Sequence, residues 1–248
     1  MIRVTVWGEN LHEAVRKQAN VLEHYPDGMH NCIARFLREE EDFEVAVTTQ
    51  FDDEGNLKED SGVTQELLDN TDVMIYWSHG GYLKVSDETV QMITDAVRKG
   101  MGIIFLHSAH ISKTFRALMG TCGRLHWREN GDWERLWVVN PAHPIAQGLG
   151  AYVRIPHEEM YGEPFGIPEP DQLVFIGAYE GGEVFRSGCC WFRDNGKVFY
   201  FQPGHETYPN YYIPEIQLII KNAVRWAAPT YRIESLGCTR ATRPVDEE

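Results

Sequence analysis

Several short apolar runs of this sequence end in histidine, serine or glutamate, the side chains that most often carry out chemistry. The run GIIFL at 102–106 is followed by HSAH, the run at 72–77 by SHGG, and the run at 197–202 by PGHE. The segment HEEMYGEPF at 157–165 adds two carboxylates, and His30 lies where a helix should begin. Imidazole titrates near neutral pH and a carboxylate can orient it, so these groups suit general acid and base catalysis.

The same side chains also suit a divalent metal site. Three imidazoles, or two with a carboxylate, can hold zinc or a similar ion that polarises a carbonyl or activates water. The candidate metal ligands, of which a subset is expected, are His30, His79, His107, His110 and His205. The candidate acids and bases are His107, His205, Glu206, Glu158 and Glu159. No HExxH motif is present, so any one of these histidines could instead be a hydrogen-bonded structural residue.

Aromatic and small residues near these positions are candidates for substrate binding. Tyr161, Trp77 and Tyr208 could stack on the C–H faces of a sugar. The amides of Gly80 and Gly81 could bind an oxyanion, and Ser108 lies on a strand-to-helix turn of the kind that carries nucleophiles. The sequence contains neither GxSxG nor Walker or GxGxxG spacing, which disfavours a serine hydrolase and a nucleotide cofactor.

Positioning these residues together requires a parallel sheet. Apolar runs alternate with amphipathic segments, which is typical of β-α units. The pattern predicts strands at 2–6, 43–47, 72–77 and 102–106, and helices at 31–39 and 86–99. In an open parallel sheet the carboxyl ends of the strands meet at one crevice, so the histidines at those ends should converge there.

The later half of the chain changes character. It predicts strands at 136–139, 173–178, 183–193 and 197–202, with 157–165 as a polar loop. Asp194-Asn195-Gly196 is a hairpin signal that makes the last two strands antiparallel, and Pro214 opens a helix with an apolar stripe. We therefore expect one α/β domain over residues 1–228, followed by a loosely attached polar tail over 229–248.

Composition narrows the function classes. The chain has 248 residues and a net charge of -14, which disfavours nucleic acid and anionic membranes as partners. No signal peptide or membrane span is visible, and five cysteines without framework spacing indicate a reducing cytoplasm. The aromatic content fits a homo-oligomer, although core packing explains the same residues.

Longer motifs carry a family resemblance. The segments YPDGMH, GMGIIFLHSAHISK, LMGTCGRLHWRENG, RLWVVNPAHPIAQGL, HEEMYGEPFGIPEP, GGEVFRSGCCWFR and FYFQPGHETYPNYY together resemble the ThuA-like, or trehalose utilisation, family over residues 2–228. The resemblance implies the class I glutamine amidotransferase-like fold, a flavodoxin-like three-layer sandwich with a mainly parallel central sheet. The residues themselves add the antiparallel C-terminal hairpin. Amidotransferases of that fold carry a cysteine nucleophile after a central strand, but here the matching turn holds His107-Ser108, which disfavours glutaminase chemistry.

The resemblance also implies a role in bacterial disaccharide metabolism, alongside an oxidoreductase that makes a keto sugar. We expect a cytoplasmic enzyme, an isomerase, lyase or hydrolase, that uses a divalent metal to act on a sugar or keto-glycoside. A non-catalytic sugar-binding or regulatory protein is the alternative, because the fold would have lost its nucleophile. A cysteine hydrolase using Cys122 or Cys189 is a third option, although neither residue occupies the expected turn.

Overall fold

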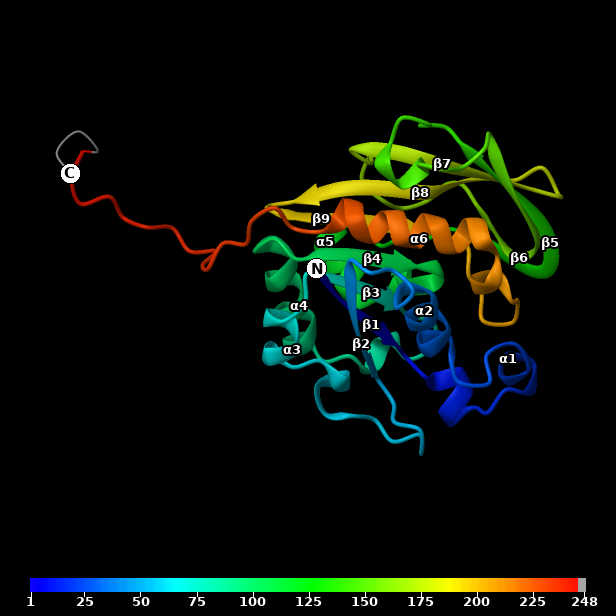
Figure 1. Ribbon diagram of the computed structural model, residues 1–248, viewed down its shortest axis with the longest axis horizontal. Coiled ribbons are helices and arrows are strands. Elements are labelled where there is room, and N and C mark those ends of the chain that lie inside the picture. The colour runs from blue at the N-terminus through cyan, green and yellow to red at the C-terminus, as the bar shows by residue number, and fades with distance from the viewer. Residues whose placement is uncertain (245–248) are drawn as a thin grey trace.

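The computed structural model describes residues 1–244 and centres on a nine-stranded mixed sheet with strand order β2-β1-β3-β4-β9-β8-β7-β5-β6 (Figure 1). The strands are β1 (Ile2–Gly8), β2 (Phe43–Thr49), β3 (Val73–Trp77), β4 (Gly102–Leu106), β5 (His126–Val138), β6 (Tyr152–Gly162), β7 (Gln172–Tyr179), β8 (Val184–Arg193) and β9 (Gly196–Phe201). The α-helices are α1 (Ala19–His24), α2 (Met29–Leu37), α3 (Gln65–Asp69), α4 (Asp87–Arg98), α5 (Lys113–Met119) and α6 (Pro214–Ala227). An additional π-helical turn, η1, covers Leu11–Val15.

Helices cover both faces of the parallel half of the sheet. On one face α2 packs against β1 and β2, and α6 packs against β4 and β9, so that Ile33 of α2 and Ile220 of α6 belong to one apolar cluster. On the other face Ile93 of α4 and Phe115 of α5 belong to a second apolar cluster. Since both faces are covered, every residue of β3 and β4 is buried, which explains why these strands read as continuous apolar runs.

The most regular helix, α4, begins where the sequence predicts. Ser86 is its N-cap, and the Ser86 hydroxyl accepts a hydrogen bond of 3.0 Å from the backbone N–H of Thr89. Asp87 and Glu88 lie in the first turn, where negative charge interacts favourably with the helix dipole. The predicted helix at 86–99 is therefore confirmed to within a residue at each end.

The sheet is less parallel than the sequence predicts. The pairings from β2 to β9 are parallel, whereas those from β9 through β8, β7 and β5 to β6 are antiparallel. The predicted hairpin of β8 and β9 is confirmed, with Arg193 opposite Gly196. The prediction of a mainly parallel sheet is therefore corrected to a mixed sheet, because β5, β6 and β7 extend that hairpin as further antiparallel strands.

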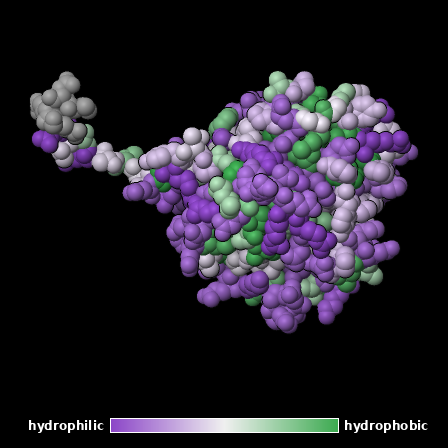
Figure 2. Space-filling view, in the orientation of Figure 1, coloured by the Kyte–Doolittle hydropathy of each residue, from purple (hydrophilic) through white to green (hydrophobic). Residues whose placement is uncertain are grey.

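Two further predictions need correction. The segment predicted as a polar loop at 157–165 lies largely in β6, which pairs with β5. The start of the predicted tail is attached, since Ile233 N–H donates to Lys99 O at 2.9 Å and Arg232 donates to Thr71 O at 2.8 Å. The last four residues of that tail, 245–248, lie outside the described residues. Within 1–244, no helix has the length and apolar character needed to cross a membrane. Figure 2 shows that the face in view is mostly hydrophilic, with smaller hydrophobic areas between the polar side chains.

Candidate functional site

The carboxyl ends of β1, β3, β4 and β9 deliver four histidines to one place. His12 lies in η1 just after β1, and His79 follows β3. His107 follows β4 directly, and His205 follows β9. Since these strands are parallel neighbours, their ends lie at the same edge of the sheet, and β6 supplies Glu159 from the antiparallel half. The convergence predicted from the strand ends is therefore observed for His79, His107 and His205.

Two imidazoles and one carboxylate form the first cluster. Nε2 of His107 lies 3.0 Å from Oε2 of Glu159, and Nε2 of His205 lies 3.8 Å from the same oxygen. These ligand atoms are close enough to hold one metal ion, and all three residues are buried. Two histidines and a carboxylate form a common ligand set for zinc and for non-haem iron.

Hydrogen bonds orient both histidines of this cluster. Nδ1 of His107 lies 2.9 Å from the backbone oxygen of Gln202, and because a carbonyl oxygen only accepts, Nδ1 carries a proton. Nδ1 of His205 lies 2.7 Å from the hydroxyl of Thr207, which itself donates to Glu129. In both residues Nε2 is thus the nitrogen that faces Glu159, as expected of metal-ligating histidines held by outer partners.

The second cluster is built around Glu206. Nδ1 of His79 lies 3.0 Å from Oε1 of Glu206, and Nδ1 of His12 lies 3.2 Å from the same oxygen. His12 also hydrogen-bonds Gln18, and its ring stacks on that of His79 at a centroid distance of 5.1 Å. His205 connects the two clusters, since its Nε2 is 3.6 Å from Oε2 of Glu206. The carboxylate of Glu206 thereby holds His79 by Nδ1, and within residues 1–244 Nε2 of His79 has no hydrogen-bond partner.

Burial and neighbouring charges give the histidines of the site different pKa values. Burial alone disfavours the imidazolium of His107, but the hydrogen bond and charge of Glu159 outweigh it and raise the His107 pKa to about 9. Burial and the charge on His107 lower the pKa of His205 to about 4. Burial opposes ionisation of Glu206, but its bond to His79 and the nearby imidazoles lower the Glu206 pKa. Without metal the site therefore contains a charged His107–Glu159 pair beside a neutral His205.

The backbone of His107 is unusual. Its φ is 51°, in the left-handed region that non-glycine residues rarely adopt and that costs about 1–3 kcal/mol. Such strain at a strand-to-helix turn is maintained only where surrounding contacts fix it, and here both ring nitrogens of His107 are engaged. The turn that could carry a nucleophile is therefore used to aim an imidazole.

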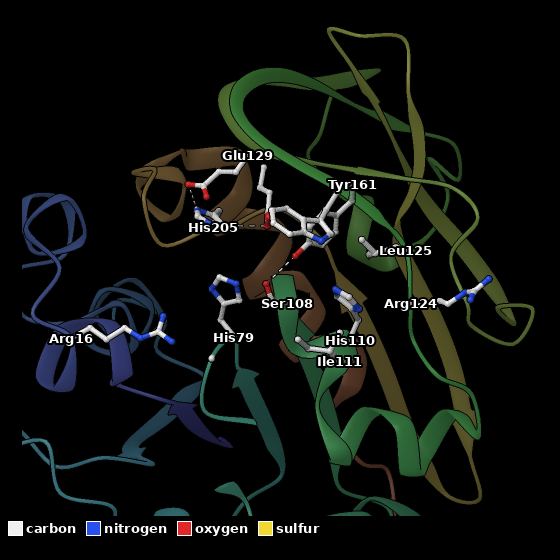
Figure 3. Close-up of a pocket in the computed structure, with 13 residues that line it drawn as sticks. Arg16, His79, Ser108, His110, Ile111, Arg124, Leu125, Glu129, Tyr161 and His205 are labelled. Atoms are coloured by element: carbon white, nitrogen blue, oxygen red, sulfur yellow. Dashed lines mark hydrogen bonds and ion pairs between the residues drawn. The ribbon is translucent and has the colours of Figure 1, made fainter. Parts of the chain in front are cut away.

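A cavity of about 460 Å³ opens beside these clusters. Figure 3 shows His79, Ser108 and His110 on one side of it and Glu129 and Tyr161 on the other. The remaining residues that line it are Arg16, Gly80, Ile111, Arg124, Leu125, Trp127, Glu159 and His205. Its size suits a sugar unit with an attached group, and none of its lining residues is a cysteine.

The aromatic candidates occupy different positions. Tyr161 lines the cavity, stacks on His107 and hydrogen-bonds the hydroxyl of Ser108 at 2.9 Å. Trp77 is buried and donates to the backbone oxygen of Gly204, while its ring packs edge-on against His79. Tyr208 is half-buried beside His205. Of these three aromatic residues, only Tyr161 lines the cavity. A further aromatic side chain, Trp127, also lines it and is 65% exposed, but the sequence analysis did not select it.

Glu158 and the glycine pair have internal partners. The Glu158 carboxylate accepts hydrogen bonds from the backbone N–H groups of Gly204 and His205 and from the side chain of Asn210. The amides of Gly80 and Gly81 both donate to Oε2 of Glu9, at 2.8 and 2.7 Å. These glycine amides are thus satisfied within the protein, in contrast to the expectation that they are free to bind an oxyanion.

Two predicted ligands lie outside the clusters. His30 lines a separate cavity with Glu13 and Asp53, where burial lowers its pKa to about 4. His110 borders the main cavity, but Nδ1 of His110 is bound to the backbone oxygen of Gly123 at 2.6 Å, and burial lowers its pKa to about 3. The structure therefore groups His107 and His205 in one cluster, places His79 in the other, and leaves His30 and His110 out of both.

Comparison with known proteins identifies the family. The sequence model of the ThuA family, described as trehalose utilisation, matches residues 3–227. The chain belongs to the ThuA family. No curated protein matches its sequence.

Solved structures agree with the ThuA fold. A ThuA-like protein from Parabacteroides merdae superposes with a TM-score of 0.70 at 14% identity, covering 94% of this chain and 92% of that chain. A ThuA-like protein from Bacteroides uniformis gives 0.64 at 17% identity, with 91% and 90% covered. A cytoplasmic protein from Salmonella typhimurium gives 0.60 at 12% identity, with 92% and 100% covered. At these identities the comparison supports the shared fold, and the chemistry has to be argued from the site.

Besides Trp127 and Glu129, the sequence analysis missed three side chains of this ThuA site that follow β1. Glu9 and His12 follow β1, whose apolar run ends in Gly8-Glu9-Asn10 with no histidine at the boundary. Glu9 follows β1 as His79 follows β3, so the expectation that residues after parallel strands converge on one site also predicts Glu9. Arg16 lines the cavity from the turn after η1, and no local pattern marks it.

Proposed function

We propose that this ThuA protein is a metal-assisted enzyme that acts on a keto-sugar or an oxidised disaccharide. The observation that carries the proposal is the approach of Nε2 of His107 and Nε2 of His205 to one carboxylate oxygen of Glu159. That oxygen is buried and has no other hydrogen-bond partner among the described residues. The donor set fits a divalent ion such as zinc, which would polarise a sugar carbonyl.

His79 is the base in this proposal. It lines the cavity, its side chain is 30% exposed, and Glu206 holds it through Nδ1, so Nε2 can accept a proton. The proton leaves the carbon next to the carbonyl, and the C–H electron pair forms a carbon–carbon double bond as the carbonyl becomes an enolate. In an elimination the enolate re-forms the carbonyl, the double-bond electrons shift to form a double bond to the next carbon, and the bond from that carbon to the glycosidic oxygen breaks. The leaving oxygen takes the proton from His79.

The keto group of such a substrate must be supplied by a preceding oxidation of a sugar hydroxyl. A sugar oxidoreductase is therefore the functional partner we propose. The cytoplasm is the proposed compartment, because the five cysteines are unpaired and the Salmonella neighbour is a cytoplasmic protein.

Metal analysis of protein purified without a histidine tag tests the proposal. We compare wild type, the His107→Ala/His205→Ala double variant and a His30→Ala control, which removes a buried histidine outside both clusters. Near-stoichiometric metal in wild type and in the control, but not in the double variant, supports the site. Metal that persists in the double variant refutes the proposed ligands.

Turnover of a keto disaccharide gives the second measurement. We expect the double variant to lose turnover and the His30→Ala control to retain it, with folding checked by circular dichroism. The charged His107–Glu159 pair is complete without metal, which favours a metal-free sugar-binding protein as the second candidate. Sugar binding without turnover in metal-loaded wild type would support that candidate instead.

A further inference from the structure

We infer that the substrate of this site carries an anionic group, a carboxylate or a phosphate, which Arg16 binds beside His79. The inference rests on the proposed function and narrows its substrate class from neutral sugars to sugar acids or sugar phosphates. Arg16 lines the cavity next to His79, as Figure 3 shows.

The guanidinium of Arg16 has no protein partner within residues 1–244. Arg16 is exposed, and among residues 1–244 Arg124 of the same cavity also lacks a partner, whereas Arg128 pairs with Glu183 and Arg186 with Glu163, both at 2.7 Å. The carboxylates nearest the chemistry are already engaged, since Glu159 pairs with His107 and Glu206 with His79. In a chain of net charge -14, an unpaired arginine at a cavity indicates an anion that comes from outside.

Gly80 explains how Arg16 reaches this position. A Cβ atom on Gly80 would lie 2.8 Å from Nη2 of Arg16 and 2.8 Å from Cδ2 of Leu11. The guanidinium therefore lies directly against the glycine, and the hydrogen bond from the Gly80 amide to Glu9 fixes that backbone. The glycine thus contributes space for the arginine, while its amide is bound elsewhere.

The charges around the cavity agree with an anionic ligand. Arg16 and Arg124 both line it, and Glu129 is the one lining carboxylate besides the engaged Glu159 among the residues that form its wall. Figure 3 shows Arg124 on the opposite side, beyond His110 and directed away from the catalytic histidines. A guanidinium presents a planar fork that binds a carboxylate or phosphate through two hydrogen bonds, which a neutral disaccharide does not require. Arg16 is the arginine placed to hold such a group next to the base.

Binding measurements with unreactive sugars test the inference independently of turnover. The probes are methyl glucoside, methyl glucuronide and methyl glucoside phosphorylated at its primary hydroxyl, each titrated calorimetrically. We expect one or both anionic probes to bind wild type at least roughly tenfold more tightly than methyl glucoside, since hydrogen bonds to charged groups have about this strength. The probe with the larger advantage distinguishes carboxylate from phosphate.

The variants locate the anion. Arg16→Gln should abolish the advantage of the anionic probe and leave the affinity for methyl glucoside unchanged, whereas Arg124→Gln should retain the advantage. Gly80→Ala should reduce the affinity advantage of the anionic probe although both arginines are present, because the new methyl group displaces the guanidinium of Arg16. Rising salt should weaken only the anionic probe.

Three results would overturn the inference. Equal affinity for neutral and anionic probes would overturn it and leave the proposed function intact. If Arg124→Gln loses the tighter binding of the anionic probe and Arg16→Gln keeps it, the anion binds at Arg124, on the other side of the cavity. Failure of all three sugars to bind would remove both the inference and the proposed sugar function.

Discussion

Replacing Glu159 with glutamine should lower the pKa of His107 and change how stability depends on pH. In wild type Glu159 holds the His107 pKa at about 9 against the opposing effect of burial. Glutamine keeps the shape of the side chain but removes the charge. Burial should then bring the His107 pKa below its ordinary 6.5, as it does for His205 at about 4 and His110 at about 3.

The size of the stability change follows from the pKa of His107 in wild type. The interval from 6.5 to about 9 corresponds to about 3 kcal/mol of unfolding free energy, since one pH unit is about 1.4 kcal/mol. Because the folded-state pKa is raised, this contribution is fully present below pH 6.5 and is lost as the pH rises through about 9. In the variant the sign reverses, and stability is lost as the pH falls below about 6.5.

Urea unfolding of chelator-treated protein between about pH 6 and about pH 10 measures this difference. The free energy of unfolding of wild type should exceed that of Glu159→Gln most at the acidic end, and the gap should narrow by about 3 kcal/mol towards the alkaline end. Imidazole resonances followed by NMR should show His107 titrating near pH 9 only in wild type. Glu129→Gln is the matched control, because Glu129 approaches His205 at 3.8 Å and does not contact His107. An unchanged His107 titration in Glu159→Gln would refute the electrostatic argument.

Two further substitutions test the hydrogen bonds that cap α4 and those that hold the turn at 204–205 in the site. Ser86→Ala removes the hydroxyl that caps α4 and should lower the free energy of unfolding by about 1 kcal/mol, whereas the exposed Ser235→Ala should have almost no effect in the same urea titration. Glu158→Gln should cost about 1–3 kcal/mol, because an amide cannot accept from all the N–H groups that now point at the carboxylate. If Glu158→Gln leaves both stability and the NMR titration of His205 unchanged, the carboxylate does not hold the 204–205 turn.

Much of the fold could be predicted because the parallel half obeys local rules. Strands buried on both faces appear as uninterrupted apolar runs, and the cap and charges of α4 mark its start. The antiparallel half was harder to predict, although short glycine-containing turns join β8 to β9 and, at Gly181-Gly182, β7 to β8. The link from β5 to β6 spans 139–151 and contains no such signal, so the direction of β6 depends on tertiary pairing.

The candidate site could be predicted in part for the same reason. A parallel sheet places the residue after each strand at a common edge, which brings His79, His107 and His205 together whatever their separation in sequence. Glu159 is different, because it belongs to a polar strand whose carboxylates are buried only once β5 and the segment after β9, at Gln202 and Gly204, are placed against it. His12 enters through a π-helical turn that no apolar periodicity marks. The predictable histidines are those that follow strands directly, while the carboxylate that completes their cluster is specified by the tertiary fold.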